Sequence, residues 1–119
     1  SPYRDIPANK DYVELYQSAF DGVPHGQDVT CFDGIQLIND AVTETGSTAP
    51  EEVIPFMRGY ELPKSARGTV KIDPKTQDVI VDVPLLHAEG TNPQDIVVDH
   101  VFEQVRGPSF DCDVSGSFQ

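Results

Sequence analysis

The side chains that most often carry catalysis or bind metal are spread thinly along this chain. His25, His87 and His100 form no i, i+4 pair and have no carboxylate at metal-ligand spacing. Ser109 and Ser115 have no nearby general base in the sequence, and no Gly-x-Ser-x-Gly, phosphate-binding or dinucleotide motif is present. We therefore expect no enzymatic activity, no bound metal and no cofactor.

The carboxylates offer a second kind of candidate chemistry. Glu51 with Glu52, or Asp111 with Asp113, could act as acid and base only if they were buried together, because close like charges drive their pKa values apart. At a helix start and in a polar tail, a solvated surface is the simpler interpretation. Asp33 differs, since it lies near a predicted helix start where the macrodipole favours a carboxylate. We favour that structural role over direct contact with a ligand.

The composition limits the size of the core and the kinds of partner. The chain has 119 residues and a hydrophobic fraction of 38%, below the roughly 45–50% of typical globular chains. We expect one domain with a thin core, or a core completed by other polypeptide. A net charge of −12 disfavours nucleic acid and anionic membranes as partners. No apolar run reaches the ~20 residues that a membrane-spanning helix needs.

The ends of the chain and its cysteines suggest further expectations. The sequence begins at Ser1 and its only methionine is Met57, so we expect that processing or excision removed upstream sequence, which could have included a signal peptide.

Cys31 and Cys112 are too few and too far apart for a zinc knuckle. They form either a disulfide or two separate thiols, and the sequence favours neither.

The first half of the chain predicts helices that would position these residues. A first helix is expected to begin at Asn9 as its N-cap, and its apolar stripe contains Tyr12, Leu15, Tyr16, Ala19 and Phe20. A second helix over residues 29–45 should end at Gly46, which readily adopts the left-handed conformation. Thr48 and Glu51 predict a capping box for a third helix, which Pro55 should kink or keep short.

The second half predicts strands. Residues 68–73 and 78–83 are rich in β-branched residues and flank turn-forming residues, so they predict a β-hairpin. In its second strand, one face is steadily apolar and the other is mixed; the apolar face has Val79, Val81, Val83 and Leu85. Because proline cannot donate a backbone hydrogen bond to a neighbouring strand, we expect Pro84 at a sheet edge or where the strand ends. Residues 95–105 suit a strand or a helix, with a strand favoured for Ile96-Val97-Val98. Residues 107–119 predict an irregular tail.

The order of these elements resembles a known family. The shared pattern runs from about Tyr3 to Gly90. Before the first helix it has Tyr3 and Pro7-Ala8-Asn9-Lys10, and it opens the second helix with Phe32-Asp33 and the third with Thr48-Ala49-Pro50-Glu51. It then has the hairpin turn within residues 68–77 and the returning strand from Val79 to His87. Together these features resemble the C-terminal third of the type I periplasmic solute-binding proteins. Members of that family capture branched-chain amino acids, amides and similar small solutes between two lobes.

The resemblance implies a fold, a function and a set of partners. The fold would be three-layered α/β, with helices on a mainly parallel sheet and a closing β-hairpin. Residues 1–90 would form the C-terminal part of a ligand-binding lobe with a strand that returns to the hinge, and residues 91–119 would form an extension. The implied function is capture of a small polar ligand for ABC-type import in the periplasm or outside the cell. Its partners would be that ligand, the transporter's membrane subunits, and either the upstream part of the same precursor or another copy of the chain.

The resemblance also suggests site residues. Cys31, Phe32 and Asp33 would lie at the edge of the ligand cleft, and His87 would lie in the hinge strand. In such a fold, six apolar side chains would lose their cover without the upstream polypeptide: Leu15, Phe20, Ile35, Ile38, Val79 and Val81. Two other functions remain open. One is a self-contained acidic interaction module whose exposed hairpin edge or apolar strand face adds to a partner's sheet. The other is a cytosolic amide-sensing regulator with the same two-lobed fold.

Overall fold

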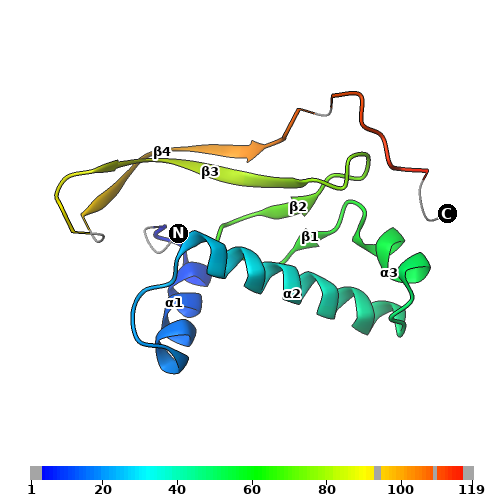
Figure 1. Ribbon diagram of the computed structural model, residues 1–119, viewed down its shortest axis with the longest axis horizontal. Helices are drawn as coiled ribbons and strands as arrows, with labels where there is room; N and C mark the ends of the chain where they lie inside the picture. The colour runs from blue at the N-terminus through cyan, green and yellow to red at the C-terminus, as the bar shows by residue number, and fades with distance from the viewer. Residues whose placement is uncertain (1–3, 93–94, 109, 117–119) are drawn as a thin grey trace.

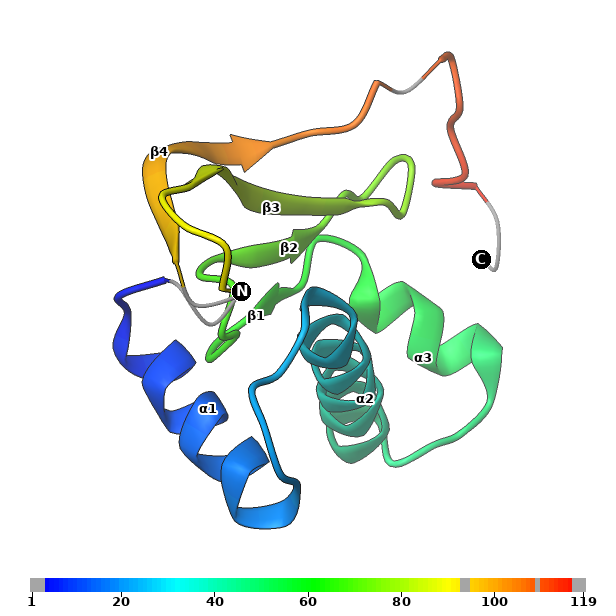
Figure 2. The ribbon, with the colours of Figure 1, turned by 60° about the vertical axis from the view of Figure 1, so that its left-hand side comes forward.

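Three helices come first along the chain and four strands follow them, in a computed structural model that describes residues 4–92, 95–108 and 110–116 (Figure 1). The helices are α1 (Pro7–Ala19), α2 (Gly26–Thr45) and α3 (Pro50–Met57). The strands are β1 (Glu61–Leu62), β2 (Val70–Ile72), β3 (Val79–Ala88) and β4 (Ile96–Val105). The helices lie on one side of the sheet in both Figure 1 and Figure 2. The fold is therefore mixed α/β, as predicted.

The four strands form one sheet in the order β1-β2-β3-β4, and every neighbouring pair is antiparallel. The prediction of a mainly parallel sheet is wrong for this chain. The reason is that consecutive strands are joined by short turns, whereas a parallel pair needs a crossover connection of about a dozen residues or more. The predicted hairpin is confirmed as β2 and β3. In its turn, Asp73 accepts hydrogen bonds from the backbone N–H groups of Lys75 and Thr76 at 2.8 and 3.3 Å.

The helix termini correct the predicted N-cap of α1 and confirm two other predictions. α1 begins at Pro7 with Ile6 as N-cap, because proline suits the first turn, where its missing N–H has no partner to lose. Asn9 is not the N-cap; it is buried and donates a hydrogen bond to the Arg4 carbonyl oxygen at 2.8 Å. α2 ends as predicted at Gly46, with φ of 66°. α3 is short, as Pro55 predicted.

The starts of α2 and α3 also differ from the predictions. The predicted Thr48–Glu51 capping box is absent, since Ala49 is the N-cap of α3 and Pro50 occupies the first helical position. α2 begins at Gly26, three residues earlier than predicted. There the Asp28 carboxylate accepts a hydrogen bond from the His25 backbone N–H at 2.7 Å, which satisfies a donor that the helix cannot use itself.

β3 and β4 form a long two-stranded ribbon. Only Val79–Val81 of β3 also pair with β2, so beyond Val81 one edge of β3 is unpaired among the described strands. Pro84 lies in this part of β3. This agrees with the prediction that Pro84 lies at a sheet edge, because proline has no N–H to donate to a neighbouring strand. The strand favoured for Ile96-Val97-Val98 is confirmed by β4, which continues to Val105. The predicted apolar face of β3 is covered only at its start, where Val79 lines a pocket with residues of α2, whereas Val83 and Leu85 are exposed. Ile80, on the mixed face, is buried.

The core is small for the length of the chain. Nine apolar residues of the described chain are buried: Tyr12, Val29, Ala41, Val53, Leu62, Ala66, Val70, Ile72 and Ile80. Of the six side chains predicted to lack cover, Leu15, Phe20, Ile35 and Ile38 are 50–68% exposed, whereas Val79 and Val81 are half-buried. The radius of gyration is 16.2 Å, against about 13.5 Å for a compact domain of this length. The molecule is therefore elongated.

The C-terminal segment has no helix or strand in residues 107–108 and 110–116, which agrees with the predicted irregular tail. It nevertheless contacts the body of the protein. The backbone N–H of Val114 donates to the Lys75 carbonyl oxygen at 2.7 Å, and the Arg58 guanidinium donates to the carbonyl oxygens of Val114 and Ser115. Both cysteines are exposed free thiols, so the disulfide alternative does not describe this structure.

Candidate functional site

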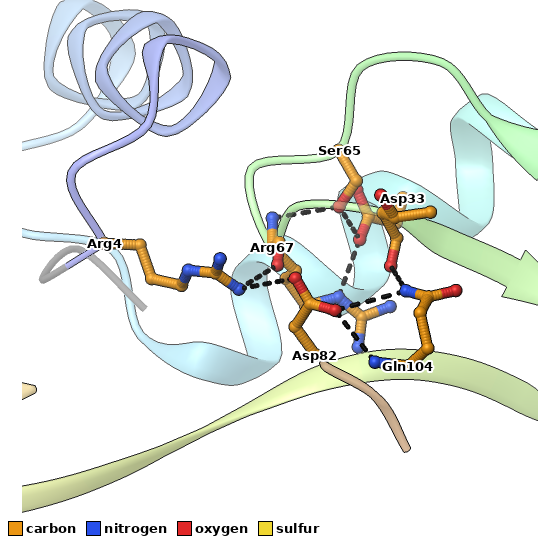
Figure 3. Close-up of polar contacts among 7 residues, drawn as sticks. Arg4, Asp33, Ser65, Arg67, Asp82 and Gln104 are labelled. Carbon is orange, nitrogen blue, oxygen red and sulfur yellow. Dashed lines mark hydrogen bonds and ion pairs between the residues drawn. The ribbon is translucent and has the colours of Figure 1, made fainter. Parts of the chain in front are cut away.

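Asp33, on α2, forms an ion pair with Arg67, which lies in the loop between β1 and β2 (Figure 3). One carboxylate oxygen, Oδ2, accepts hydrogen bonds from Arg67 Nε and from Ser65 Oγ, each at 2.8 Å. Ser65 Oγ also accepts a hydrogen bond from the Arg67 backbone N–H at 3.0 Å. The side chain of Asp33 is 4% exposed and that of Arg67 is 21% exposed. Each charge is thus matched by its partner, as burial requires.

The position of Asp33 on α2 corrects the role predicted for it. Because α2 starts at Gly26, Asp33 lies about two turns into the helix, beyond the first turn in which the macrodipole acts. The carboxylate is held by Arg67 and Ser65 from the loop between β1 and β2 instead. The contact therefore ties the longest helix to the loop that leads into the sheet.

The second oxygen of this carboxylate, Oδ1, is buried and has no hydrogen-bond partner among the described residues. Asp33 also lines a pocket of about 180 Å³ between α2 and the sheet. Around Asp33 and Arg67 the pocket wall is largely apolar; its other residues are Thr30, Gly34, Leu37, Tyr60, Leu62, Val70, Ile72 and Val79. A buried acceptor of this kind is normally satisfied by a protein group, by water or by a ligand.

A second polar network joins the N-terminal segment to the sheet (Figure 3). Arg4 donates to the Arg67 carbonyl oxygen at 2.7 Å and to Asp82 Oδ2 at 3.2 Å. Gln104 donates to Asp82 Oδ1 from its backbone and its side chain, each at 3.1 Å. Burial alone would raise the pKa of Asp82, but the hydrogen bonds from Gln104 and Arg4 outweigh it and lower that pKa. Gly68 approaches Asp82 so closely that a Cβ would lie 2.8 Å from Oδ2.

An apolar groove of about 580 Å³ lies between α1 and α2. Cys31 and Phe32 both line it, so the structure brings these two predicted site residues together. The groove is completed by Tyr12, Leu15, Tyr16, Ala19, Phe20, Asp28 and Ile35. Aromatic rings form much of its wall, and the Tyr12 and Phe32 ring centroids are 5.1 Å apart. Asp33, the neighbour of Phe32 in sequence, lines the separate pocket described above.

His87 lies on the β3–β4 ribbon and lines neither of these two cavities. Its Nδ1 is 2.7 Å from an Asp99 carboxylate oxygen, and its Nε2 is 3.5 Å from a Glu89 carboxylate oxygen. The hydrogen bond to Asp99 is the main cause of a raised pKa for His87, and both carboxylates attract its charged form. The structure therefore does not join His87 to Cys31, Phe32 or Asp33 in one site.

The described residues form neither a metal centre nor a membrane-spanning helix. In residues 4–92, 95–108 and 110–116, no group of three or more histidine, cysteine, aspartate or glutamate side chains is arranged to hold a metal ion. No helix in the described parts of the chain is long and apolar enough to cross a bilayer. The chemistry that the described groups offer is hydrogen bonding and ion pairing within an apolar setting.

Sequence reasoning missed Arg67 and Ser65. They lie 34 and 32 residues from Asp33, and no motif spans that interval. One weak signal was available, since an aspartate between Phe32 and Ile35 on a helix needs a cation if it is buried, and the chain has only 8 basic residues. Choosing Arg67 from those eight requires the three-dimensional structure.

Comparisons with known proteins gave no match to a family profile, to a curated protein or to a solved structure. The chain is a mixed α/β protein with its helices on one face of an antiparallel sheet, and it has the two cavities described above. The resemblance to type I solute-binding proteins rests on the residue pattern described above.

Proposed function

We propose that this chain is the C-terminal part of a two-lobed solute-binding receptor, located in the periplasm or secreted, that delivers a small polar solute to an ABC-type importer. The ligand would be an amino acid, an amide or a similar molecule. The proposal has two supports. The first is the pattern of motifs from about Tyr3 to Gly90, and the second is the apolar surface that the chain leaves exposed.

The exposed surface is the observation on which the proposal depends most. The chain exposes 7813 Å², whereas a folded monomer of 13.1 kDa exposes about 6,400 Å². The difference, about 1,400 Å², exceeds the ~800 Å² that one partner contributes to a stable interface of standard size. Large apolar residues account for part of this surface, including Ile35 and Phe20 on the helices and Phe102 on the ribbon. Additional polypeptide of the same precursor would cover them.

In the proposed receptor, the parallel strands of the three-layer fold would come from that upstream polypeptide. The antiparallel strands described above would be the closing part, and the β3–β4 ribbon with His87 would lead to the hinge. A ligand bound between two lobes shifts the equilibrium toward a closed state because it contacts both lobes only in that state. Such a receptor performs no chemistry on its ligand, in agreement with the expected lack of catalysis.

The two exposed cysteines provide a test of the ligand cleft. The intact protein from its natural source would be treated with iodoacetamide, with and without branched-chain amino acids or small amides. If Cys31 lies at the cleft edge, a bound ligand should slow its alkylation. Cys112, in the tail, is the internal control and should react at the same rate throughout. The alkylation of each thiol is followed by peptide mass spectrometry.

Small-angle scattering on the same samples measures closure. A ligand that protects Cys31 should also reduce the radius of gyration of the intact protein, because the two lobes approach each other. If no member of the panel protects Cys31 or reduces the radius of gyration, the receptor proposal is wrong.

The ribbon supports a second candidate function, that of an acidic interaction module. β4 pairs only with β3 among the described strands, so its other edge presents unpaired backbone groups, and Val97, Phe102 and Val105 are exposed. Such an edge can add to the sheet of a partner. This function predicts that the isolated chain associates through β4. A chain that remains monomeric and unfolds cooperatively at micromolar concentration would count against it.

A further inference from the structure

The apolar groove between α1 and α2 supports an inference that goes beyond the proposed receptor function and does not rest on it. Its volume of about 580 Å³ lies within the range of roughly 300–1,000 Å³ that is usual for small-molecule sites. Four aromatic rings follow one another along its wall, with successive centroids 5.0–6.3 Å apart: Phe32, Tyr12, Tyr16 and Phe20. Among the described residues that line the groove, Asp28 is the only acidic or basic one.

The spacing of these rings allows one cation to contact two of them. A cation is attracted to the face of an aromatic ring when it lies within about 6 Å of the ring centroid. Centroids that are 5.0 or 5.1 Å apart, as in two of the pairs, can both lie within that distance of a single cation. A ligand can reach the wall from solvent, because Phe20 is 61% exposed and Tyr16, Phe32 and Asp28 are half-buried.

The charge around the groove favours a cation over an anion. Within the described chain no lysine, arginine or histidine forms an ion pair with Asp28. Burial raises the pKa of the Tyr12 hydroxyl, and the negative charge of Asp28 raises it further, so this charge acts on the groove wall. Residues 7–45 contain seven acidic side chains and one lysine, Lys10, which pairs with Asp5. Such a surface attracts cations and repels anions.

The apolar wall decides which kind of cation fits. A primary ammonium group has three N–H donors, and a groove with one carboxylate would leave some of them without an acceptor, at a cost in free energy. A quaternary ammonium group has no N–H donor, and its methyl groups can pack against apolar side chains such as Leu15 and Ile35, which also line the groove. Proteins recognise quaternary ammonium groups with aromatic rings.

We propose that the groove between α1 and α2 binds a small molecule with a quaternary ammonium group. The rings of Tyr12, Tyr16 and Phe32 contact its methyl groups, and Asp28 supplies the opposite charge. A second copy of the chain suits the groove less well, because it would bring two acidic pairs of helices together.

Two probes of nearly equal shape isolate the contribution of the charge. Choline and 3,3-dimethyl-1-butanol have the same hydroxyl group, but a carbon atom in the alcohol replaces the charged nitrogen. Each would be titrated into the full 119-residue chain while the backbone amide chemical shifts of α1 and α2 are recorded by NMR. We expect choline to bind about tenfold more tightly, because the rings and Asp28 both attract its charge. Equal binding of the two probes, or no binding of either, overturns the proposal.

Cys31 reports whether the probe occupies the groove. Cys31 is an exposed thiol that lines it, so bound choline should slow its alkylation by iodoacetamide more than the alcohol does. Cys112, in the tail, should react at the same rate throughout. The same measurement would be made on the intact protein from its natural source. If choline protects Cys31 in the 119-residue chain but not in the intact protein, further polypeptide fills the groove and the proposal is wrong. That result would leave the receptor proposal standing, because its own test uses amino acids and amides.

A substitution at Asp28 tests the assigned counter-charge. Asp28→Asn removes the charge but keeps an oxygen that can accept the hydrogen bond from the His25 backbone N–H. This variant should lose much of the preference for choline. Asp78→Asn is the matched control, because Asp78 also accepts a hydrogen bond from a backbone N–H, that of Val79, and does not line the groove. An unchanged preference in Asp28→Asn excludes the assigned role.

A second pair of variants tests the aromatic wall. Phe20→Leu removes an exposed ring from the groove and keeps an apolar side chain, so choline should bind about two- to fivefold more weakly. Phe102→Leu makes the same change at an exposed ring on β4, outside the groove, and should leave choline binding unchanged. Equal affinities of these two variants for choline would place the binding site elsewhere and overturn the proposal.

Discussion

Removing the guanidinium of Arg67 should destabilise this protein strongly. Asp33 is 4% exposed, and in the Arg67→Ala variant it would keep Ser65 as its one remaining side-chain partner among the described residues. Breaking a buried ion pair by removing one partner costs about 3–5 kcal/mol. Since Arg67 is 21% exposed, water can reach part of the site, so we expect about 3 kcal/mol, the lower end of that range. The total stability of a domain is only about 5–15 kcal/mol.

A double-mutant cycle separates the ion pair from other effects of the substitution. The free energy of unfolding would be measured by urea denaturation, followed by far-UV circular dichroism, for Arg67→Ala, Asp33→Ala and the double variant. The double variant should lose less stability than the two single variants combined, because the second substitution removes a charge that the first left unpaired.

The exposed ion pair between Lys10 and Asp5 provides the control. Lys10→Ala removes a charge that water already solvates, so its unfolding midpoint should match that of the unsubstituted protein. The reasoning fails if Arg67→Ala has the same midpoint as Lys10→Ala, or if the effects of Arg67→Ala and Asp33→Ala are additive.

Two further predictions concern the sheet. Gly68→Ala should cost about 1–3 kcal/mol, since Gly68 has φ of +95° and a Cβ there would lie 2.8 Å from Asp82 Oδ2. Gly34→Ala, on α2 with open space around its Cβ, should instead stabilise by about 0.5–1 kcal/mol; equal effects in urea denaturation would contradict this. On the ribbon, the hydrogen bond to Asp99 raises the pKa of His87 above 6.5, so the interaction stabilises the fold fully below about pH 6.5 and is lost as the pH rises through the folded-state pKa. An NMR titration of the imidazole should show a lower pKa in Asp99→Asn, and an unchanged value would refute the assigned cause.

Local sequence chemistry predicted much of the secondary structure. Gly46, Pro55 and the turn after Asp73 act through their own backbone preferences, and these features are present where the sequence placed them. The N-cap at Asn9 was wrong because Pro7 competes for the helix start, and the capping box at Thr48 was wrong because Pro50 does the same for α3. Competing local signals of similar strength are hard to rank without the structure.

Long-range features could not be read from the sequence. The parallel sheet was expected from a family resemblance, whereas the strands of this chain are joined by turns too short for parallel pairing. The apolar face of β3 was identified by counting apolar residues, but only the start of that face is covered, because β2 pairs with Val79–Val81 alone. The site was found in part: Asp33 was singled out, but its partners Arg67 and Ser65 lie on a distant loop.

The length of the native polypeptide tests the central proposal most directly. The protein would be isolated from its natural source with an antibody against this chain, and its intact mass would be measured under denaturing and reducing conditions. The receptor proposal predicts a single polypeptide of at least about 200 residues, because each of two lobes needs roughly 100–150 residues. A native polypeptide of 119 residues would leave no second lobe to close on a ligand and would contradict the proposal.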